Sequence, residues 1–330
     1  MKRSVFILAL FALPAIFLSC RREKKKFIMA EVNPAESMSY RMDQFFCDEV
    51  KTLSKGSIEI ELAAAGVLGD ESSVVDEMRI GKKIDIARVS TMALNKQGCE
   101  KLSLLTLPYT FNNREHFWKF AKSELADDFL SESAEGPDGL VGLFFAEEGF
   151  RHFFSTKKLD SHEDFKGHRV RIASDPVLTG VVNDMNAIPV DLKFTDLMKA
   201  MVLGNIDTAE QPLINYSANH FDSVAKNVIL DGHTIGVIEV LITKQAWNSL
   251  KPKEQEILRK AGSDAADYGR KIVEEQENST MEKLIKEGVV FTEVTDKSPW
   301  KKICSTTISK YTSNNSELYR KIVEMGDGNQ

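Results

Sequence analysis

The sequence lacks the short motifs that mark most catalytic and nucleotide-binding sites. It contains no GxxxxGK[ST], GxGxxG, HExxH or GxSxG pattern. Its six histidines show no metal-ligand spacing, and no two cysteines form a CxxC pair. No catalytic triad can be nominated from the spacing of its residues. We therefore predict that the protein is not an enzyme and that it uses no cofactor and no metal ion.

Low-complexity stretches and internal repeats are also missing, and the composition is typical of a soluble globular protein. The 330 residues correspond to about two domains. Residues 1–26 contain seven Lys or Arg and one Glu, so the remainder has 36 basic and 48 acidic side chains, a difference of −12. A body this acidic is a poor binder of nucleic acid, and we expect no such partner.

Residues 1–20 are typical of a lipoprotein signal peptide. The apolar run "SVFILALFALPAIFLS" is short for a transmembrane helix and fits a signal h-region. A small residue, Ser19, precedes Cys20, so we expect Cys20 to become an acylated N-terminus that anchors the protein to a membrane. Residues 21–26 would then form a basic tether near anionic lipid headgroups. An uncleaved anchor and a plain secretory signal stay open, because five positive charges follow the apolar run.

Three further cysteines are present: Cys47, Cys99 and Cys304. An exported protein could join two of them in a disulfide and leave one free. The sequence does not say which.

Strand-like and helix-like segments alternate from residue 27 onward. The strands "FIMAEV", "SIEIEL" and "IDIARVS" are separated by two amphipathic helices, which predicts a parallel β-α-β-α-β unit. The same rhythm restarts after about residue 150, with a later helix capped by Thr195. Residues 253–286 are almost continuously helical over roughly 50 Å. We expect this helix to brace two lobes, with bends at Gly262 and Gly269.

These patterns predict an α/β fold of two lobes with a cleft between them. We expect the chain to pass from one lobe to the other around Glu148–Phe150. The predicted first lobe is 27–148 with about 237–276, and the second is 149–236 with about 277–330.

The stretch "DFKGHRVRIAS" contains a strand that carries two arginines, Arg169 and Arg171, opposite Val170 and Ile172. An unpaired buried charge costs several kcal/mol. Either both arginines lie on a wet face, or one waits in a cleft for a negative partner from outside the chain.

Five stretches, in order, resemble one family. They are "KGSIEIELAAAGVLGDESSVVDEMRIGKKIDIARVST", "LTLPYTF", "FRHFFSTKKLDSHEDFKGHRVRI", "FTDLMKAMVLGNIDTAEQP" and "WNSLKPKEQEIL". Together they resemble the solute-binding proteins (the DctP-like P subunits) of tripartite ATP-independent periplasmic (TRAP) transporters. The resemblance covers nearly all of 27–290.

The resemblance implies a two-lobe periplasmic protein whose cleft closes on a small organic anion. It implies delivery of that solute to the small and large membrane subunits of a permease. The positions that match binding positions of the family are Arg171, Arg151, Gln211, Phe194, Glu210, Ser90, Thr91, Asp70 and Glu71. Among these, Arg171 stands at the position of the arginine that holds a substrate carboxylate, and a guanidinium fork suits that group.

Some positions depart from the family pattern, among them Met198, Thr208 and Ala209. These departures argue against a sialic-acid-like ligand and leave room for a less polar monocarboxylate. A branch of the family works with a tetratricopeptide-repeat lipoprotein, and a lipid-anchored binder of a more hydrophobic ligand fits that branch. Two other functions stay open: an enzyme on the same scaffold, and a sensor or adhesion lipoprotein with no permease.

Overall fold

A computed structural model describes residues 24–81, 83–132, 139–173 and 175–326. The predicted signal peptide, Cys20 and residues 21–23 of the predicted basic tether lie outside these residues. The tether prediction is wrong for Lys25 and Lys26, because both belong to the first strand of the fold, and Lys25 Nζ lies 2.6 Å from Glu254 Oε2. No helix in the described part of the chain combines the length and the apolar character that a membrane span requires.

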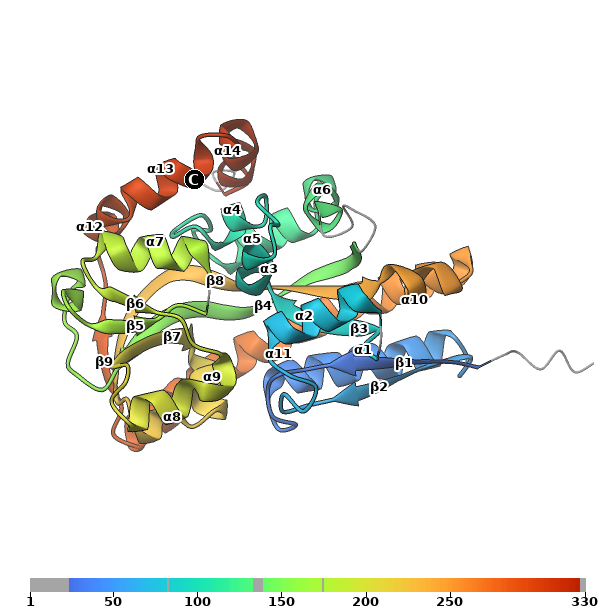
Figure 1. The fold of residues 1–330 in the computed structure, drawn as a ribbon, viewed down its shortest axis with the longest axis horizontal. Coiled ribbons are helices and arrows are strands. Elements are labelled where there is room, and N and C mark those ends of the chain that lie inside the picture. The colour runs from blue at the N-terminus through green and yellow to red at the C-terminus, as the bar shows by residue number, and fades with distance from the viewer. Residues whose placement is uncertain (1–23, 82, 133–138, 174, 327–330) are drawn as a thin grey trace, which may run out of the picture.

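The structure has two lobes built on one continuous sheet (Figure 1). The sheet order is β2-β1-β3-β8-β4-β7-β5-β6, and β9 pairs with β8 at one side. The strands are β1 (Lys25–Ala30), β2 (Ile58–Ala63), β3 (Ile86–Ser90), β4 (Leu140–Ser155), β5 (Arg169–Arg171), β6 (Ile188–Val190), β7 (Thr208–Pro212), β8 (Asn227–Thr243) and β9 (Val290–Glu293).

The helices of the first lobe lie from the middle to the right of Figure 1, and they cover β1 to β3 and the adjoining parts of β4 and β8. They are α1 (Met38–Leu53), α2 (Glu71–Ile80), α3 (Thr91–Lys96), α4 (Ser103–Thr106), α5 (Arg114–Ala121), α6 (Glu124–Leu130) and α10 (Lys244–Ser249). The strands β1 and β2 are parallel, as are β1 and β3, so the predicted β-α-β-α-β unit is confirmed.

The second lobe repeats this arrangement around β5 to β7, with β5 parallel to both neighbours. Its helices are α7 (Pro176–Asp184), α8 (Leu197–Val202), α9 (Leu213–Ala218), α12 (Ser298–Ile303) and α13 (Ser305–Thr312), with the 3-10 turns η2 (His162–Phe165), η3 (Phe194–Asp196) and η4 (Phe221–Ser223). One apolar cluster lies under α7 and α12, and another lies under α8 and α9, so both faces of this half-sheet are covered.

Two long antiparallel strands, β4 and β8, pass through both lobes. Their register shifts between Glu147 and Phe150, at the place where the sequence predicts the crossing. Gly149 lies inside this bulge with φ +94°, a backbone conformation that favours glycine.

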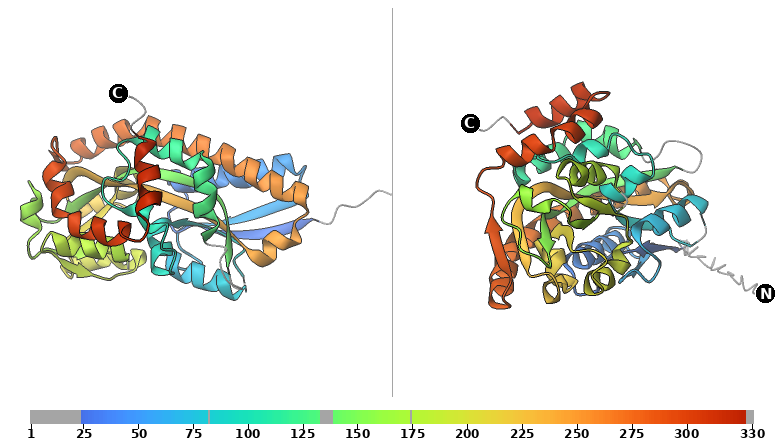
Figure 2. Two further views of the ribbon diagram at one scale, coloured as in Figure 1. Left: turned by 90° about the horizontal axis from the view of Figure 1, so that it is seen from above. Right: turned by 60° about the vertical axis from the view of Figure 1, so that its left-hand side comes forward.

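The predicted bracing helix is α11 (Pro252–Lys286), which runs along the molecule past both lobes (Figure 2). It packs against α1 and β4 in the first lobe and α9 in the second. The helix is continuous, and its two glycines allow neighbouring side chains to pack closely against it. A Cβ at Gly262 would overlap the ring of Phe144, and one at Gly269 would lie 2.7 Å from Met42 Sδ.

Two details differ from the sequence prediction. Thr195 does not cap a helix, because it lies inside η3 and α8 begins only at Leu197. The final helix, α14 (Ser316–Glu324), packs on the first lobe although residues 277–330 were assigned to the second. Its apolar face buries Ile322 in the first-lobe core, and the Ile322 carbonyl oxygen lies 2.7 Å from His116 Nε2.

Candidate functional site

A cavity of about 270 Å³ lies between the lobes. Side chains from the start of α2 and the end of β3 line it on the first lobe, and those near the ends of β5, β6 and β7 line it on the second. The carboxyl ends of strands in a parallel sheet are where α/β proteins commonly bind ligands. The predicted residues that line the cavity are Asp70, Glu71, Ser90, Arg151, Arg171, Phe194 and Gln211.

Arg171, the last residue of β5, is 5% exposed. Its Nε donates a hydrogen bond to the Leu192 carbonyl oxygen at 3.0 Å, and its guanidinium carbon lies 5.9 Å from the centre of the Phe194 ring. No ion pair joins Arg171 to a described acidic residue. Burial lowers the pKa of Arg171 to about 10, so the side chain is charged at neutral pH. The cavity therefore holds a desolvated positive charge without a carboxylate partner among the described residues.

The other arginine of the strand, Arg169, has a different environment. Its side chain is 45% exposed, and its Nε lies 4.0 Å from Asp207 Oδ2. It does not line the cavity. Of the two arginines in this strand, Arg169 is therefore exposed to solvent and Arg171 is buried.

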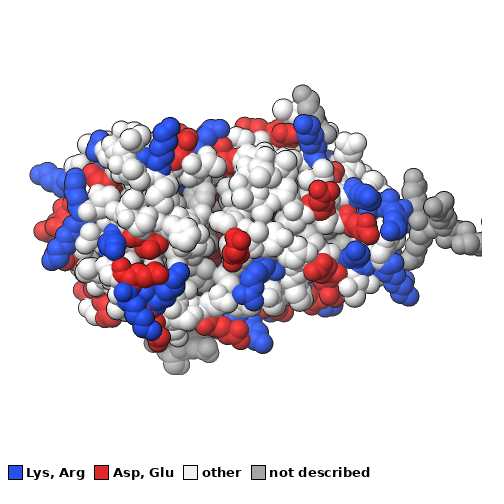
Figure 3. Space-filling view, turned by 90° about the horizontal axis from the view of Figure 1, so that it is seen from below, with Lys and Arg blue, Asp and Glu red and all other residues white. Residues whose placement is uncertain are grey.

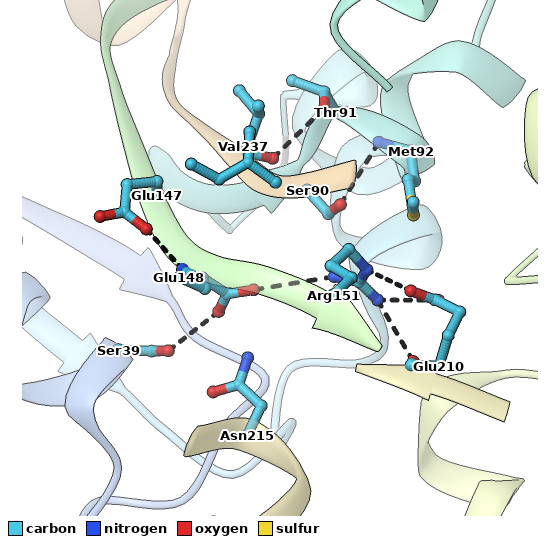
Figure 4. A network of polar contacts seen from close by, with 12 residues as sticks. Ser39, Ser90, Thr91, Met92, Glu147, Glu148, Arg151, Glu210, Asn215 and Val237 are labelled. Carbon is cyan, nitrogen blue, oxygen red and sulfur yellow. Dashed lines mark hydrogen bonds and ion pairs between the residues drawn. The ribbon is translucent and has the colours of Figure 1, made fainter. Parts of the chain in front are cut away.

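Arg151, on β4, already has a partner inside the protein (Figure 4). Its Nε and Nη2 both donate to the Glu210 carboxylate, the latter at 2.9 Å. Its Nη1 lies 3.9 Å from Glu148 Oε2. The planar fork that could hold a solute carboxylate is therefore largely occupied, although the residue does line the cavity.

Glu210 is fully buried on β7 and is not among the residues that line the cavity. Burial disfavours its charged form, but Arg151 and His233 outweigh that effect and hold the pKa of Glu210 far below its ordinary value. The sequence placed Glu210 in contact with the ligand. The structure places it behind Arg151, as an internal counter-ion.

The first-lobe candidates also fall into two groups. Glu71 accepts a hydrogen bond from the Ser90 backbone N–H at 2.8 Å, and both residues line the cavity. Asp70 caps α2 by accepting from Ser73 N–H, and it lies 2.8 Å from Lys193 Nζ of the second lobe. Thr91 lies outside the cavity: it is fully buried and donates to the Val237 carbonyl oxygen at 3.2 Å.

Several lining residues were missed by the sequence analysis, chiefly Asn33, Arg88, Lys193 and Asn215. Arg88 is 3% exposed on β3 and pairs with Glu148, while Glu31 lies 3.5 Å away. A charged residue in the otherwise apolar run 86–89 of this strand was the signal that could have found Arg88. No sequence pattern could have predicted Lys193 as a lining residue, because its position at the cavity depends on its contact with Asp70 of the other lobe.

In the described part of the chain, no group of three or more His, Cys, Asp or Glu side chains is arranged to hold a metal ion. Cys47, Cys99 and Cys304 are buried, and no disulfide joins any two of these three cysteines, so the predicted option of such a bond is not realised.

Comparison with known proteins places this architecture in context. The model of the family described as "Bacterial extracellular solute-binding protein, family 7" matches residues 29–314. The chain is 24% identical over 253 residues to the C4-dicarboxylate-binding periplasmic protein of Rhodobacter capsulatus, covering 76% of this chain and 75% of that one. It is 26% identical over 247 residues to the 2,3-diketo-L-gulonate-binding periplasmic protein of Escherichia coli, covering 74% of each.

Solved structures agree with this result. A TRAP periplasmic solute-binding protein of Xanthobacter autotrophicus with bound β-D-galacturonate superposes with a TM-score of 0.86 at 26% identity, covering 90% of this chain and 99% of that one. One from Pseudomonas putida with bound D-glucuronate gives 0.87 at 26% identity, covering 92% and 97%. The fold is therefore that of the two-lobe periplasmic binding proteins, as predicted. The chain belongs to family 7 of the bacterial extracellular solute-binding proteins, the TRAP solute-binding proteins.

Proposed function

We propose that this protein is the periplasmic receptor of a TRAP transporter, and that it binds a small carboxylate between its lobes through Arg171. The observation that carries the proposal is the buried guanidinium of Arg171, which lines the cavity and has no ion pair with a described acidic residue. A carboxylate offers such a group two charge-assisted hydrogen bonds. The solute is held and released without chemical change, so the protein is not an enzyme.

Closure of the lobes would accompany binding, with the hinge in β4 and β8 at the bulge around Gly149. We divide the lobes as the sequence suggests, at 148/149 and near 236/237 and 276/277, with α14 lying on the first lobe. Of the remaining predicted residues, Arg151 would add a second positive charge near the solute. The others would contact the solute as parts of the cavity wall: Phe194, Gln211, Ser90 and Glu71.

Delivery to the two membrane subunits of a permease follows from family membership, and a lipid on Cys20 would keep the receptor near them. A tetratricopeptide-repeat partner rests on the sequence resemblance alone. Nucleic acid is a poor partner for this molecule. On the face shown in Figure 3, Lys and Arg are interspersed with Asp and Glu and form no extended basic surface.

The test compares two ligands and two variants. D-Glucuronate and D-glucose share a ring and differ in the carboxylate, so only D-glucuronate should raise the melting temperature, as binding to the folded state requires. Arg171→Ala should weaken D-glucuronate binding at least about 100-fold, because two charged hydrogen bonds contribute about 1.5–3 kcal/mol each. Arg169→Ala, two residues away on the same strand, is the matched control and should bind as the parent does.

Arg171→Lys keeps the charge and loses the fork, and it should fall between the parent and Arg171→Ala. Equal binding of D-glucuronate by Arg171→Ala and Arg169→Ala would contradict the residue assignment. If D-glucose and other neutral sugars bind the parent and a wider set of carboxylates does not, the proposed solute class is wrong.

A further inference from the structure

Four segments of the first lobe meet where β1 begins, at the end of the molecule farthest from the second lobe (Figure 1). The Lys25 backbone N–H donates to the Ser57 carbonyl oxygen at 2.9 Å, and Lys25 Nζ donates to the Ser249 carbonyl oxygen at 2.5 Å. The turn before β3 lies beside them, because Asp85 Oδ2 accepts a hydrogen bond from the Ile28 N–H at 2.8 Å. We call the surface formed by the described parts of 24–26, 51–57, 79–84 and 249–253 the basic end.

The sequences of these four segments contain basic side chains and no acidic ones. Together they have ten Lys or Arg and no Asp or Glu, although residues 27–330 as a whole have 36 basic and 48 acidic side chains. Average composition therefore does not account for the basic end. It gives an otherwise acidic molecule one positive pole, which is seen edge-on at the right of Figure 3, beside the grey residues.

Structural roles within the fold account for part of this charge. Lys24 and Lys51 lie 3.6 and 3.7 Å from Glu59 Oε1, and Lys51 also stands in the last turn of α1, where a cation stabilises a helix. Five other lysines of the basic end are exposed and form no ion pair with a described acid: Lys26, Lys55, Lys83, Lys251 and Lys253. Their charges are available to a partner from outside the chain.

The chain outside the described residues joins the fold at this same end. Cys20 precedes Lys24 by four residues, which span at most about 14 Å. A lipid on Cys20 would therefore hold the basic end against the headgroups of the bilayer. Anionic headgroups attract each nearby lysine and repel the acidic remainder of the molecule. The charge pattern and the short connection both select a membrane surface as the partner.

Contact at the basic end leaves the cavity free, because α2 and β3 have the two sites at their opposite ends. Glu71 starts α2 at the cavity, and the helix ends at Ile80, three residues before Lys83. The strand β3 begins at Ile86 and ends at Ser90, again at the cavity. Ten residues of helix span about 15 Å, which separates the cavity from the basic end.

We propose that the basic end is a membrane-contact surface, whose lysines bind anionic phospholipid headgroups and hold the first lobe next to the bilayer. The second lobe is then the one that moves when the cavity opens and closes. This inference goes beyond the proposed receptor function, since the contact requires neither a bound solute nor acylation of Cys20.

The experiment uses residues 20–330 with Cys20→Ser, which contain the whole described fold and cannot be acylated at that position. Sedimentation measures binding to vesicles of phosphatidylcholine alone and to vesicles of phosphatidylcholine and phosphatidylglycerol in equal parts. The parent should bind only the vesicles with phosphatidylglycerol, and about 0.5 M sodium chloride should release it. The triple variant Lys55→Gln, Lys83→Gln and Lys253→Gln should bind about 100 times more weakly, because each lysine near an anionic surface contributes about fivefold.

The matched control combines Lys166→Gln, Lys199→Gln and Lys302→Gln. It changes the net charge equally at exposed positions of the second lobe, and it should retain most of the parent's binding. Equal losses in the two triple variants would show a response to net charge alone and would overturn the inference. A parent that does not sediment with phosphatidylglycerol vesicles at low salt would also overturn it, and an acidic protein surface would then be the partner to test.

Binding of D-glucuronate separates this inference from the receptor function. Both triple variants should bind D-glucuronate with the dissociation constant of the parent, since none of the six positions lines the cavity, and this result also shows that the variants are folded. If D-glucuronate binds and the vesicles do not, the receptor function stands and the membrane contact is wrong. If the vesicles bind as expected and no carboxylate does, the membrane contact stands without that function.

Discussion

Lys193→Ala should shift the ligand-free protein toward an open arrangement of its lobes. Lys193 Nζ of the second lobe lies 2.8 Å from Asp70 Oδ2 of the first, and we call these two residues the interlobe pair. Hydrogen bonds from Lys193 and Ser73 outweigh the effect of burial and lower the pKa of Asp70, which keeps it charged at neutral pH. Opening the lobes separates the two charges, so the pair favours the closed form.

The size of the effect follows from exposure. The side chain of Lys193 is 61% exposed and that of Asp70 is 10% exposed, so water screens the pair strongly. Ion pairs this exposed shift an equilibrium by about two- to fivefold. We expect Lys193→Ala to raise the ratio of open to closed molecules by that factor. At 1 M salt, where the screening length is about 3 Å, the parent should approach the variant.

The assay is the distance between spin labels on Ile80→Cys of the first lobe and Ile188→Cys of the second, with Cys20 changed to Ser. Both positions are exposed, whereas the three remaining cysteines are buried. The matched control is Lys157→Ala, because Lys157 lies 2.9 Å from Asp207 with 59% and 6% exposure, but both residues belong to the second lobe. Equal shifts for Lys193→Ala and Lys157→Ala, or none for either, would refute the reasoning.

Two further predictions concern stability. Gly262→Ala should lower the free energy of unfolding by about 1–3 kcal/mol, because the new methyl group would overlap the buried Phe144 ring. Gly269→Ala should change the free energy of unfolding little, because the flexible Met42 side chain can move. Urea unfolding of both variants measures the two values, and equal losses would contradict this account. Burial disfavours the charged His233 ring, but Asp231 at 2.7 Å and Glu210 outweigh it and raise the pKa of His233 to about 9 from an ordinary 6.5. The contribution of charged His233 to stability is therefore complete below about pH 6.5 and is lost as the pH rises through about 9. The melting temperature of the parent should fall more between pH 7 and 10 than that of His233→Gln. Parallel curves for the two proteins would show that the charge on His233 is not responsible.

Local patterns were sufficient to predict much of the fold. The alternation in "SIEIEL" and the helical spacing before and after it fix a parallel unit, because the period of a strand and that of a helix differ. The crossing between the lobes was also predicted near Glu148–Phe150, where the register of β4 and β8 shifts. The C-terminal region was not predictable in this way, because the position of α14 depends on contacts distant in sequence. Ile322 is buried in the first-lobe core, and its carbonyl oxygen lies 2.7 Å from Nε2 of His116, which is 206 residues earlier in the chain.

The candidate site shows the same limit at the level of single residues. Matching positions in the sequence motifs correctly predicted several residues that line one cavity: Arg171, Phe194, Gln211, Glu71 and Ser90. Sequence could not tell which charges cancel one another, since that depends on side-chain geometry across strands. The sequence therefore predicts Glu210 as a ligand contact, whereas the structure pairs it with Arg151 outside the cavity lining.

Internal ion pairs involve two of the three buried arginines of the cavity and leave the third, Arg171, without such a pair among the described residues. Arg88 meets Glu31 and Glu148, and Arg151 meets Glu210. Arg171 meets a backbone oxygen and the Phe194 ring, neither of which neutralises its charge. The free protein has thus already desolvated and oriented this guanidinium. A carboxylate that enters the cavity does not have to bear that cost again, and preorganisation of this kind is what converts a single charged contact into affinity.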